Sequence, residues 1–259
     1  MSNAQTETQT QATATGDVNY VITRNGRHQY KFHKDYAEGH GRTDESLWYP
    51  SVTTIAGYIG GDNFSMGMNW ALAQARENDN DLDAPRRLGK LANEQGSKLH
   101  ADIDQFIKDP RYMPSEDNDL FMLWHRELGG QRWLASEQFV VNPNKGYGGT
   151  IDAMSLEPEG FTIWDWKTKS RSSYERNGGL AKDPVQLTAY AQALHAMGHP
   201  LAPVKGFIAY IMRDGEGIDV VPVDISPIGK SEKLFHVAHD MYNIMRTKET
   251  EIEETEIKK

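Results

Sequence analysis

The pattern of apolar and polar residues changes character near residue 136. Before that point, leucine, isoleucine and aromatic side chains recur every three or four positions over residues 86–107 and 117–135, which predicts two helices. Shorter helices are expected to begin at Ser51 and to cover residues 70–75. The first half of the chain is therefore predicted to be largely helical.

The N-terminal end of the chain departs from this helical pattern. Residues 18–33 hold two β-rich runs on either side of Asn25-Gly26, which predicts a hairpin followed by a polar loop over residues 34–46. Residues 1–16 are rich in Gln, Thr and Ala and have little to bury, so we expect a disordered tail there.

Beyond residue 136 the pattern is one of short strands. Three runs rich in Val, Ile, Thr, Phe and Trp are separated by Asn-Pro-Asn-Lys-Gly and Glu-Pro-Glu-Gly turns. They predict an antiparallel meander over residues 137–141, 148–156 and 161–168. A helix should follow, with Asp183 as its N-cap and Pro184 in its first position.

The end of the chain completes an α/β pattern. Residues 204–213 and 217–224 flank Asp214-Gly215 and predict a second hairpin, and residues 231–248 predict a final amphipathic helix. We expect an α/β fold in which a central mixed sheet is flanked by helices, with a mainly helical N-terminal elaboration. The expected division is a disordered tail over 1–16, a hairpin and helical region over 17–135, a core over 136–248 and an acidic tail over 249–259.

The composition excludes several kinds of site. The 259 residues include no cysteine, which rules out disulfides, thiolate zinc sites, iron–sulfur clusters and cysteine nucleophiles. No apolar run is long enough to span a membrane, and the N-terminus lacks the basic start and apolar run of a secretory signal. We therefore expect a cytoplasmic protein with no membrane partner.

The charge balance bears on nucleic-acid binding. A formal net charge of −9 argues against tight, non-specific coating of DNA. It does not exclude a basic groove at a metal site, because divalent cations offset clustered carboxylates locally.

Three residues on the second and third strands of the predicted meander carry candidate chemistry. Asp165 and Lys167 alternate with Trp164 and Trp166, so the acid and the lysine point to one face. If the strands are neighbours, Asp152 lies beside Asp165, and the two carboxylates can hold Mg²⁺ or Mn²⁺. The Lys167 ammonium can orient water or stabilise developing negative charge, as phosphodiester hydrolysis requires. A D-x-K tripeptide by itself can equally be a solvated strand face.

Four further residues can join the same site. Gln186 and Tyr190 share one helix face just after the D-x-K strand, although they can also be a polar edge and a half-buried aromatic. His100 is either structural or a ligand, and its nitrogen would suit manganese better than magnesium. Glu137 begins the first strand of the meander and is either an exposed edge charge or an acid of the site.

Basic and aromatic residues offer contacts with nucleic acid, with ordinary structural roles as the alternative. Basic side chains can bind phosphates or be solvated helix charges, and aromatic rings can stack on unpaired bases or lie in the core. The basic candidates are Lys169, Arg171, Arg86, Arg87, Lys90 and Lys98, and the aromatic candidates are Trp48, Tyr49 and Trp70.

Five motifs, GSKLH, EQFVV, GGTIDAM, IWDWKTKS and DPVQLTAYAQAL, occur in that order. Together they resemble the PD-(D/E)xK (restriction-endonuclease-like) nuclease superfamily. Within it they resemble the RecB-like exonuclease branch, closest to the mitochondrial genome maintenance exonuclease and its phage-encoded relatives. In those proteins too, a PSVT segment, here in residues 49–54, precedes a helix with a tryptophan, here Trp70. The resemblance runs from about residue 48 to residue 248.

The resemblance implies a role for each site residue. The implied metal ligands are His100, Asp152, Asp165 and the carbonyl of Trp166. The implied catalytic lysine is Lys167, beside Gln186 and Tyr190, which shape the site and hold DNA, and Glu137, which matches the acidic strand position.

The resemblance also implies a function. It implies a helical arch over the active site, here residues 51–135, through which a single strand would pass. The implied activity is that of a Mg²⁺- or Mn²⁺-dependent DNA exonuclease, which acts at free ends in replication, recombination or repair. The sequence has no Walker A pattern, so a partner protein would supply unwinding. The short, stand-alone chain is similar to phage enzymes. An endonuclease of the same fold, or a catalytically silent nuclease fold that binds DNA or a protein, are the alternatives.

Overall fold

The structure is a computed structural model of the chain. It describes residues 6–12, 19–32, 48–59, 63–115, 118–158, 160–198 and 203–257. The polar loop predicted over residues 34–46 lies outside these ranges. No helix among the described residues is long and apolar enough to cross a membrane.

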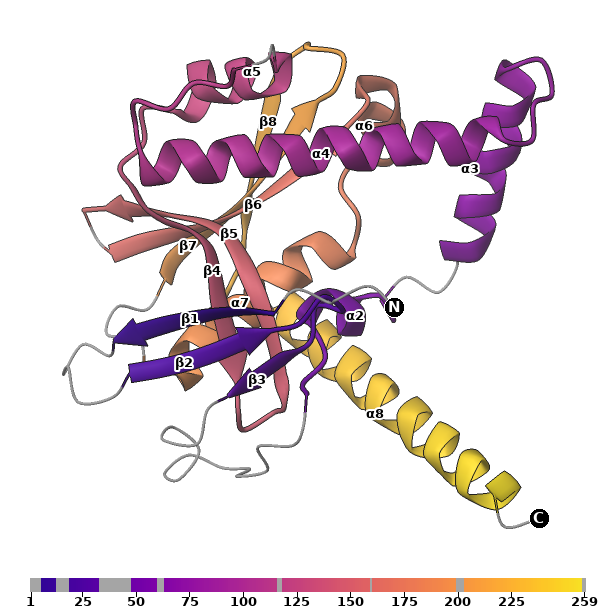
Figure 1. Cartoon of the computed structure of the whole chain (residues 1–259), viewed down its shortest axis with the longest axis vertical. Coiled ribbons are helices and arrows are strands. Elements are labelled where there is room, and N and C mark those ends of the chain that lie inside the picture. The colour runs from indigo at the N-terminus through magenta and orange to yellow at the C-terminus, as the bar shows by residue number, and fades with distance from the viewer. Residues whose placement is uncertain are drawn as a thin grey trace.

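A five-stranded mixed sheet forms the centre of the fold, in the order β4-β5-β6-β7-β8 (Figure 1). The predicted meander and the predicted second hairpin are confirmed, because β4, β5 and β6 pair antiparallel and so do β7 and β8. Strands β6 and β7 pair in parallel, which makes the sheet mixed as expected. The strands are β4 (Trp133–Asn142), β5 (Tyr147–Glu157), β6 (Gly160–Lys169), β7 (Pro203–Met212) and β8 (Ile218–Val223).

The parallel pairing follows from a helical crossover, since parallel strands cannot be joined by a tight turn. Helix α7 (Lys182–Ala196) supplies it, preceded by a short helix α6 (Arg171–Asn177) that the sequence pattern did not predict. The N-cap prediction for Asp183 was wrong, because α7 begins at Lys182. Asp183 is instead buried in the first turn, where its carboxylate accepts hydrogen bonds from Leu180 N at 2.9 Å and Tyr210 Oη at 3.0 Å.

One face of the sheet is covered by α4 (Ala84–Lys108) and α5 (Asp119–Leu128). The predicted helix over residues 117–135 was too long, because Gly129 and Gly130 follow Leu128 and β4 then begins. The core on this face contains a group of packed indoles. Its tryptophans are Trp124, Trp133, Trp164 and Trp166.

The other face is covered by α7, by α2 (Val52–Ala56) and by α8 (Lys230–Ile257). Ser51 caps α2 by accepting from Thr54 N, so the helix begins as predicted but has only 5 residues. Helix α8 continues to Ile257 and projects away from the body of the protein in Figure 1, so the acidic segment assigned to a separate tail is largely a continuation of the helix. Helix α3 (Asn63–Glu77) leads into α4.

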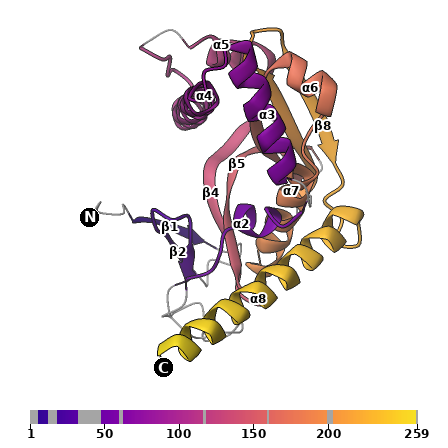
Figure 2. The ribbon, with the colours of Figure 1, turned by 90° about the vertical axis from the view of Figure 1, so that its right-hand side faces the viewer.

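A second, three-stranded sheet lies beside β4 and β5, below α4 in the view of Figure 2. It contains the predicted hairpin, β2 (Asn19–Arg24) with β3 (Tyr30–Phe32), and adds β1 (Glu7–Ala12) along β2. The prediction of disorder was therefore wrong for residues 7–12. The reason is tertiary: Gln9 Nε2 donates to the Glu137 carbonyl at 2.7 Å, and its Oε1 accepts from Phe139 N at 2.8 Å.

Candidate active site

A cavity of about 930 Å³ opens between α4 and the three-stranded sheet. Strands β4, β5 and β6 and helix α7 contribute its floor. The cavity brings together every residue that the sequence proposed for the catalytic and metal-binding groups. These are His100, Glu137, Asp152, Asp165, Trp166, Lys167, Gln186 and Tyr190.

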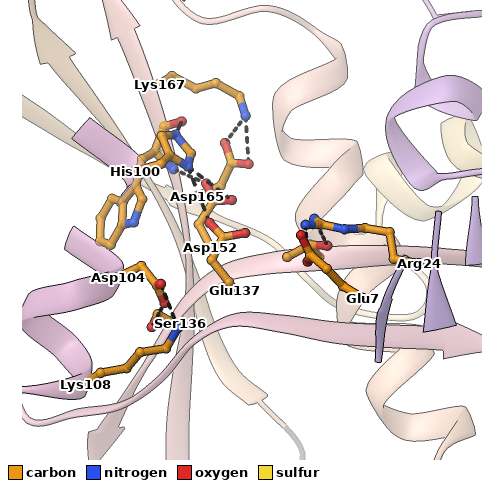
Figure 3. Close-up of polar contacts among 12 residues, drawn as sticks. Glu7, Arg24, His100, Asp104, Lys108, Ser136, Glu137, Asp152, Asp165 and Lys167 are labelled. Carbon is orange, nitrogen blue, oxygen red and sulfur yellow. Dashed lines mark hydrogen bonds and ion pairs between the residues drawn. The ribbon is translucent and has the colours of Figure 1, made fainter. Parts of the chain in front are cut away.

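Strand β6 places Asp165 and Lys167 on one side, as alternation requires. The Lys167 Nζ donates to Asp165 Oδ1 at 2.7 Å and lies 2.6 Å from Oδ2 (Figure 3). Asp152 on the neighbouring strand accepts a hydrogen bond from Trp166 N at 2.7 Å through Oδ2. This bond fixes one carboxylate oxygen of Asp152 and leaves Oδ1 directed toward His100.

A second group of ligand atoms gathers around His100 of α4. Its Nδ1 lies 3.8 Å from Glu137 Oε1 and 3.8 Å from Asp152 Oδ1, and its Nε2 lies 3.3 Å from the Trp166 carbonyl oxygen. One ligand atom from each of His100, Glu137 and Asp152 lies within 4.8 Å of the others. Two ligands about 2.1–2.4 Å from a shared cation lie no more than about 5 Å apart, so these donors fit a divalent ion.

Glu137 has an unusual backbone conformation. Its φ is 47°, in the left-handed region that non-glycine residues rarely adopt. The register of β4 and β5 pairs Ser136 with Ala153 and Gln138 with Ile151, so Glu137 lies opposite Asp152 and on the same face of the sheet. Gln9 holds the Glu137 carbonyl at this point. Non-glycine residues in such conformations cluster at functional sites.

Helix α7 supplies the buried polar residues beneath the cavity. Gln186 and Tyr190 are 3% and 5% exposed, so Gln186 is not an exposed polar edge and Tyr190 is more than half-buried. Tyr190 packs against Gly149, and Tyr30 packs against Gly148. The two glycines of the GGTID motif are therefore explained by the close approach of two tyrosine rings to β5.

Residues 69–256 match the family model of the PD-(D/E)XK nuclease superfamily. The chain belongs to this superfamily. No curated protein matches the sequence. Among solved structures, the crystal structure of SSO0001 is 14% identical with a TM-score of 0.38 and covers 75% of each chain. The crystal structure of LHK-Exo in complex with dAMP is 11% identical with a TM-score of 0.37, covering 79% of this chain and 94% of that chain.

The acids and bases of this PD-(D/E)XK site perturb one another strongly. Burial raises the pKa of Asp165 to about 7 and also raises the pKa of Asp152. Burial disfavours the charge of His100, but Asp152 and Glu137 outweigh it and raise the pKa of His100 to about 9. Burial likewise opposes the charge of Lys167, whose pKa is nevertheless raised by Asp165 and Asp152. A divalent cation would relieve the repulsion among the carboxylates.

The assignment of metal ligands in this superfamily member stays a prediction, and two acids bear on it. Asp165, expected among the metal ligands, has both carboxylate oxygens close to Lys167. Glu137, whose role the sequence left open, completes the triad of ligand atoms with His100 and Asp152. The pairing of β4 with β5 explains this, because it sets Glu137 opposite Asp152 and therefore on the same face of the sheet.

None of the predicted DNA-binding basic residues lines the cavity, and their roles stay predictions. Lys169 Nζ donates to the Gly178 carbonyl at 2.7 Å, and Arg171 binds the Glu216 carbonyl at 2.6 Å. Arg87 pairs with Asp81 at 2.8 Å. On α4, Arg86, Arg87, Lys90 and Lys98 are exposed.

The aromatic candidates divide between the core and the surface. Tyr49 is 5% exposed and belongs to the core, whereas Trp70 on α3 is 47% exposed. Trp48 is half-buried.

Sequence reasoning missed several residues of the cavity wall. Arg24 and Glu7 come from the three-stranded sheet, and Asp104 and Lys108 come from the C-terminal half of α4. Asp104 accepts a hydrogen bond from Ser136 Oγ at 2.6 Å and pairs with Lys108 at 2.7 Å. The helical spacing of His100 and Asp104, four apart on one face of α4, could have indicated the acid. No local signal marks Arg24.

Proposed function

We propose that this chain is a divalent-metal-dependent DNA exonuclease of the RecB-like branch, acting on single-stranded ends in replication, recombination or repair. The observation that supports it is the convergence of His100, Glu137 and Asp152 with the Asp165–Lys167 pair in one cavity. Membership of the PD-(D/E)XK nuclease superfamily supports the class of reaction.

The metal would be Mg²⁺ or Mn²⁺, held by His100, Glu137 and Asp152, with Asp165 and the Trp166 carbonyl beside them. When bound it would polarise the phosphoryl group and favour ionisation of the attacking water. The imidazole ligand favours manganese, and the carboxylates suit both ions.

The residues around the ion divide the remaining work. Asp165 holds the Lys167 ammonium at 2.7 Å and so directs a fixed positive charge toward the reacting phosphate, where negative charge develops. Asp152 is itself oriented by the Trp166 amide, so its position is set before substrate arrives. Gln186 and Tyr190 close the cavity from below and shape the space for the strand.

The preference for single strands is supported by the size of the site. A cavity of about 930 Å³ has room for a nucleotide or two of one strand rather than for a duplex. Its walls come from α4 on one side and the three-stranded sheet on the other, so a strand end can lie between them.

The test uses Lys167→Ala and Asp165→Asn against wild type on end-labelled single strands with Mg²⁺ or Mn²⁺. Removing a group that stabilises transition-state charge typically costs about 10²–10³ in rate, and we expect losses of at least that size. Arg126→Ala, an exposed change on α5 outside the cavity, is the control and should leave the rate unchanged. Equal rates in all variants would remove Lys167 and Asp165 from the mechanism.

A covalently closed single-stranded circle distinguishes the alternatives. An exonuclease leaves the circle intact while it degrades the linear strand. Cleavage of the circle would establish an endonuclease. Binding of DNA without cleavage in any divalent metal would establish a catalytically silent nuclease fold.

A further inference from the structure

Arg24, the last residue of β2, presents a guanidinium to the cavity from outside the group of catalytic candidates. Its side chain is 18% exposed, and its Cζ lies 4.8 Å from the centre of the Phe139 ring. Its Nη1 donates to Thr150 Oγ1 at 3.3 Å, and Thr150 also hydrogen-bonds Tyr30 Oη at 2.8 Å. Packing and hydrogen bonding therefore hold the guanidinium in place.

The position of Thr150 relates Arg24 to the metal ligands. Thr150 and Asp152 are two residues apart on β5 and both line the cavity. Two residues of a strand span about 7 Å, so Thr150, which binds the guanidinium, lies about 7 Å along β5 from the candidate metal ligand Asp152. A nucleic-acid strand that places one phosphate at the ion would carry a neighbouring phosphate toward Arg24.

The partner of Arg24 is a carboxylate delivered by another strand. Arg24 Nη2 donates to Glu7 Oε2 at 2.6 Å, and Figure 3 shows this pair to one side of the His100–Glu137–Asp152 group. The Glu7 side chain is 55% exposed, so solvent or a ligand can replace its carboxylate at Arg24. Strand β1 that carries it is fastened to β4 through Gln9.

The other lysine and arginine cations that line the cavity are paired differently. Lys108 pairs with Asp104 of its own helix at 2.7 Å, and Lys167 pairs with Asp165 of its own strand at 2.7 Å. Arg24 takes its acid from β1. A guanidinium binds carboxylate and phosphate through the same planar fork, so a carboxylate at this position can stand in for a phosphate.

We propose that Arg24 binds a backbone phosphate of the nucleic-acid strand, next to the phosphate at the metal ligands, and that Glu7 occupies this subsite in the free protein. The identity of the substrate rests on the proposed function. Substrate binding then displaces Glu7 from Arg24, and β1 acts as an intramolecular competitor. A purely structural Arg24–Glu7 pair would only fasten β1 to β2.

The two roles predict effects of different sign. In the competitor role, Arg24→Gln raises KM for a single-stranded oligodeoxythymidylate, whereas Glu7→Gln lowers it. In a structural role, both changes loosen the same contact and shift KM and thermal stability in the same direction. The exposed pair of Arg126 and Glu127 on α5, 2.9 Å apart and outside the cavity, provides the matched controls Arg126→Gln and Glu127→Gln.

The experiment measures KM and kcat with Mn²⁺, and binding by fluorescence anisotropy with Ca²⁺ over a range of salt concentrations. For Arg24→Gln we expect KM to rise about tenfold or more with little change in kcat, as for loss of a hydrogen bond between charged groups. The slope of log affinity against log salt should fall by about 0.7, the value for one phosphate contact on a single strand. Arg24→Lys should fall between wild type and Arg24→Gln.

Each outcome supports or overturns the proposal. A lower KM in Glu7→Gln with a higher KM in Arg24→Gln supports it. An unchanged KM and salt slope in Arg24→Gln, or a higher KM in Glu7→Gln, overturns it even though the wild type cuts DNA. If the wild type cuts no nucleic acid, the proposed function fails while the anisotropy series still decides whether Arg24 binds phosphate. Should Arg24→Gln fail to fold, Arg24→Lys and Glu7→Gln give the same decision.

Discussion

Gly149 offers a direct test of how tightly α7 is fitted beneath the site. A Cβ at this position would overlap Cε1 of the Tyr190 ring and would lie 3.0 Å from Cδ1 and 3.3 Å from Cζ. The ring is 5% exposed, so it has little space into which to move. Gly149→Ala therefore forces the ring, the helix or the strand to shift.

The expected cost follows from this overlap. Adding a methyl group to a packed interior typically destabilises a protein by about 1–3 kcal/mol. At roughly 2–4 °C per kcal/mol for a chain of this size, Tm should fall by about 2–12 °C. Gly130→Ala is the control, because a Cβ there meets nothing within 4 Å. Its Tm should stay within about 2 °C of wild type, since open surface sites change stability by less than about 0.5 kcal/mol.

A double mutant checks that Tyr190 is the cause. Tyr190→Ala alone removes a buried ring and should destabilise by about 3–5 kcal/mol. In Gly149→Ala/Tyr190→Ala the new methyl group no longer overlaps a ring, so the double mutant should be more stable than the sum of the single changes by about 1–3 kcal/mol. Urea unfolding measures the cycle, and the cleavage rate should fall in Gly149→Ala. The reasoning is refuted if the two changes are additive, or if Gly149→Ala is as stable and active as Gly130→Ala.

Three further predictions concern the cation and the long helix. A divalent cation at about 100 times its Kd should stabilise the protein by about 2.7 kcal/mol and raise its Tm. A chelator or the substitution Asp152→Asn should abolish this rise, and an undiminished rise in the variant would place the ion elsewhere. Cation affinity should rise at least about tenfold per pH unit from pH 6 to 8, because His100 must lose its proton to become a ligand. Burial lowers the pKa of His100, but Asp152 and Glu137 outweigh it and raise the pKa to about 9. Calorimetric affinities that do not depend on pH would contradict this prediction. Phe235→Ala on α8 should lower the free energy of unfolding by about 3–5 kcal/mol, measured by chemical denaturation. The Phe235 ring is fully buried and packs against Tyr147 with centroids 4.9 Å apart. A loss below about 1 kcal/mol would mean that α8 contributes little to the core.

The strands of the main sheet could be predicted because their signals are local. The turns between β4, β5 and β6 carry Asn, Pro and Gly, and alternation alone placed Asp165 and Lys167 on one side. Strand β1 gave no such signal, because its Gln- and Thr-rich sequence is held by Gln9 against β4, at a separation of 128 residues from Glu137. Tertiary contacts of this kind override composition.

The site could be predicted where its residues follow from spacing and missed where they follow from folding. His100, Asp152, Asp165 and Lys167 lie in motifs, and the cavity contains all four. Glu137 also lies in a motif, EQFVV, so it was a candidate, although no propensity favours its φ of 47° for glutamate. Arg24 reaches Thr150 across 126 residues of sequence, so only the folded chain shows that it belongs to the wall of the cavity.

The packed tryptophans lie directly beside the candidate active site. The Trp164 and Trp166 rings are stacked with centroids 5.6 Å apart, and the Trp166 amide donates to Asp152 while its carbonyl lies beside His100. A ligand that binds at that carbonyl is one residue's length from the packed indoles. We therefore expect ligand binding to change the ultraviolet emission of the unlabelled protein, which would report occupancy in real time and without a substrate.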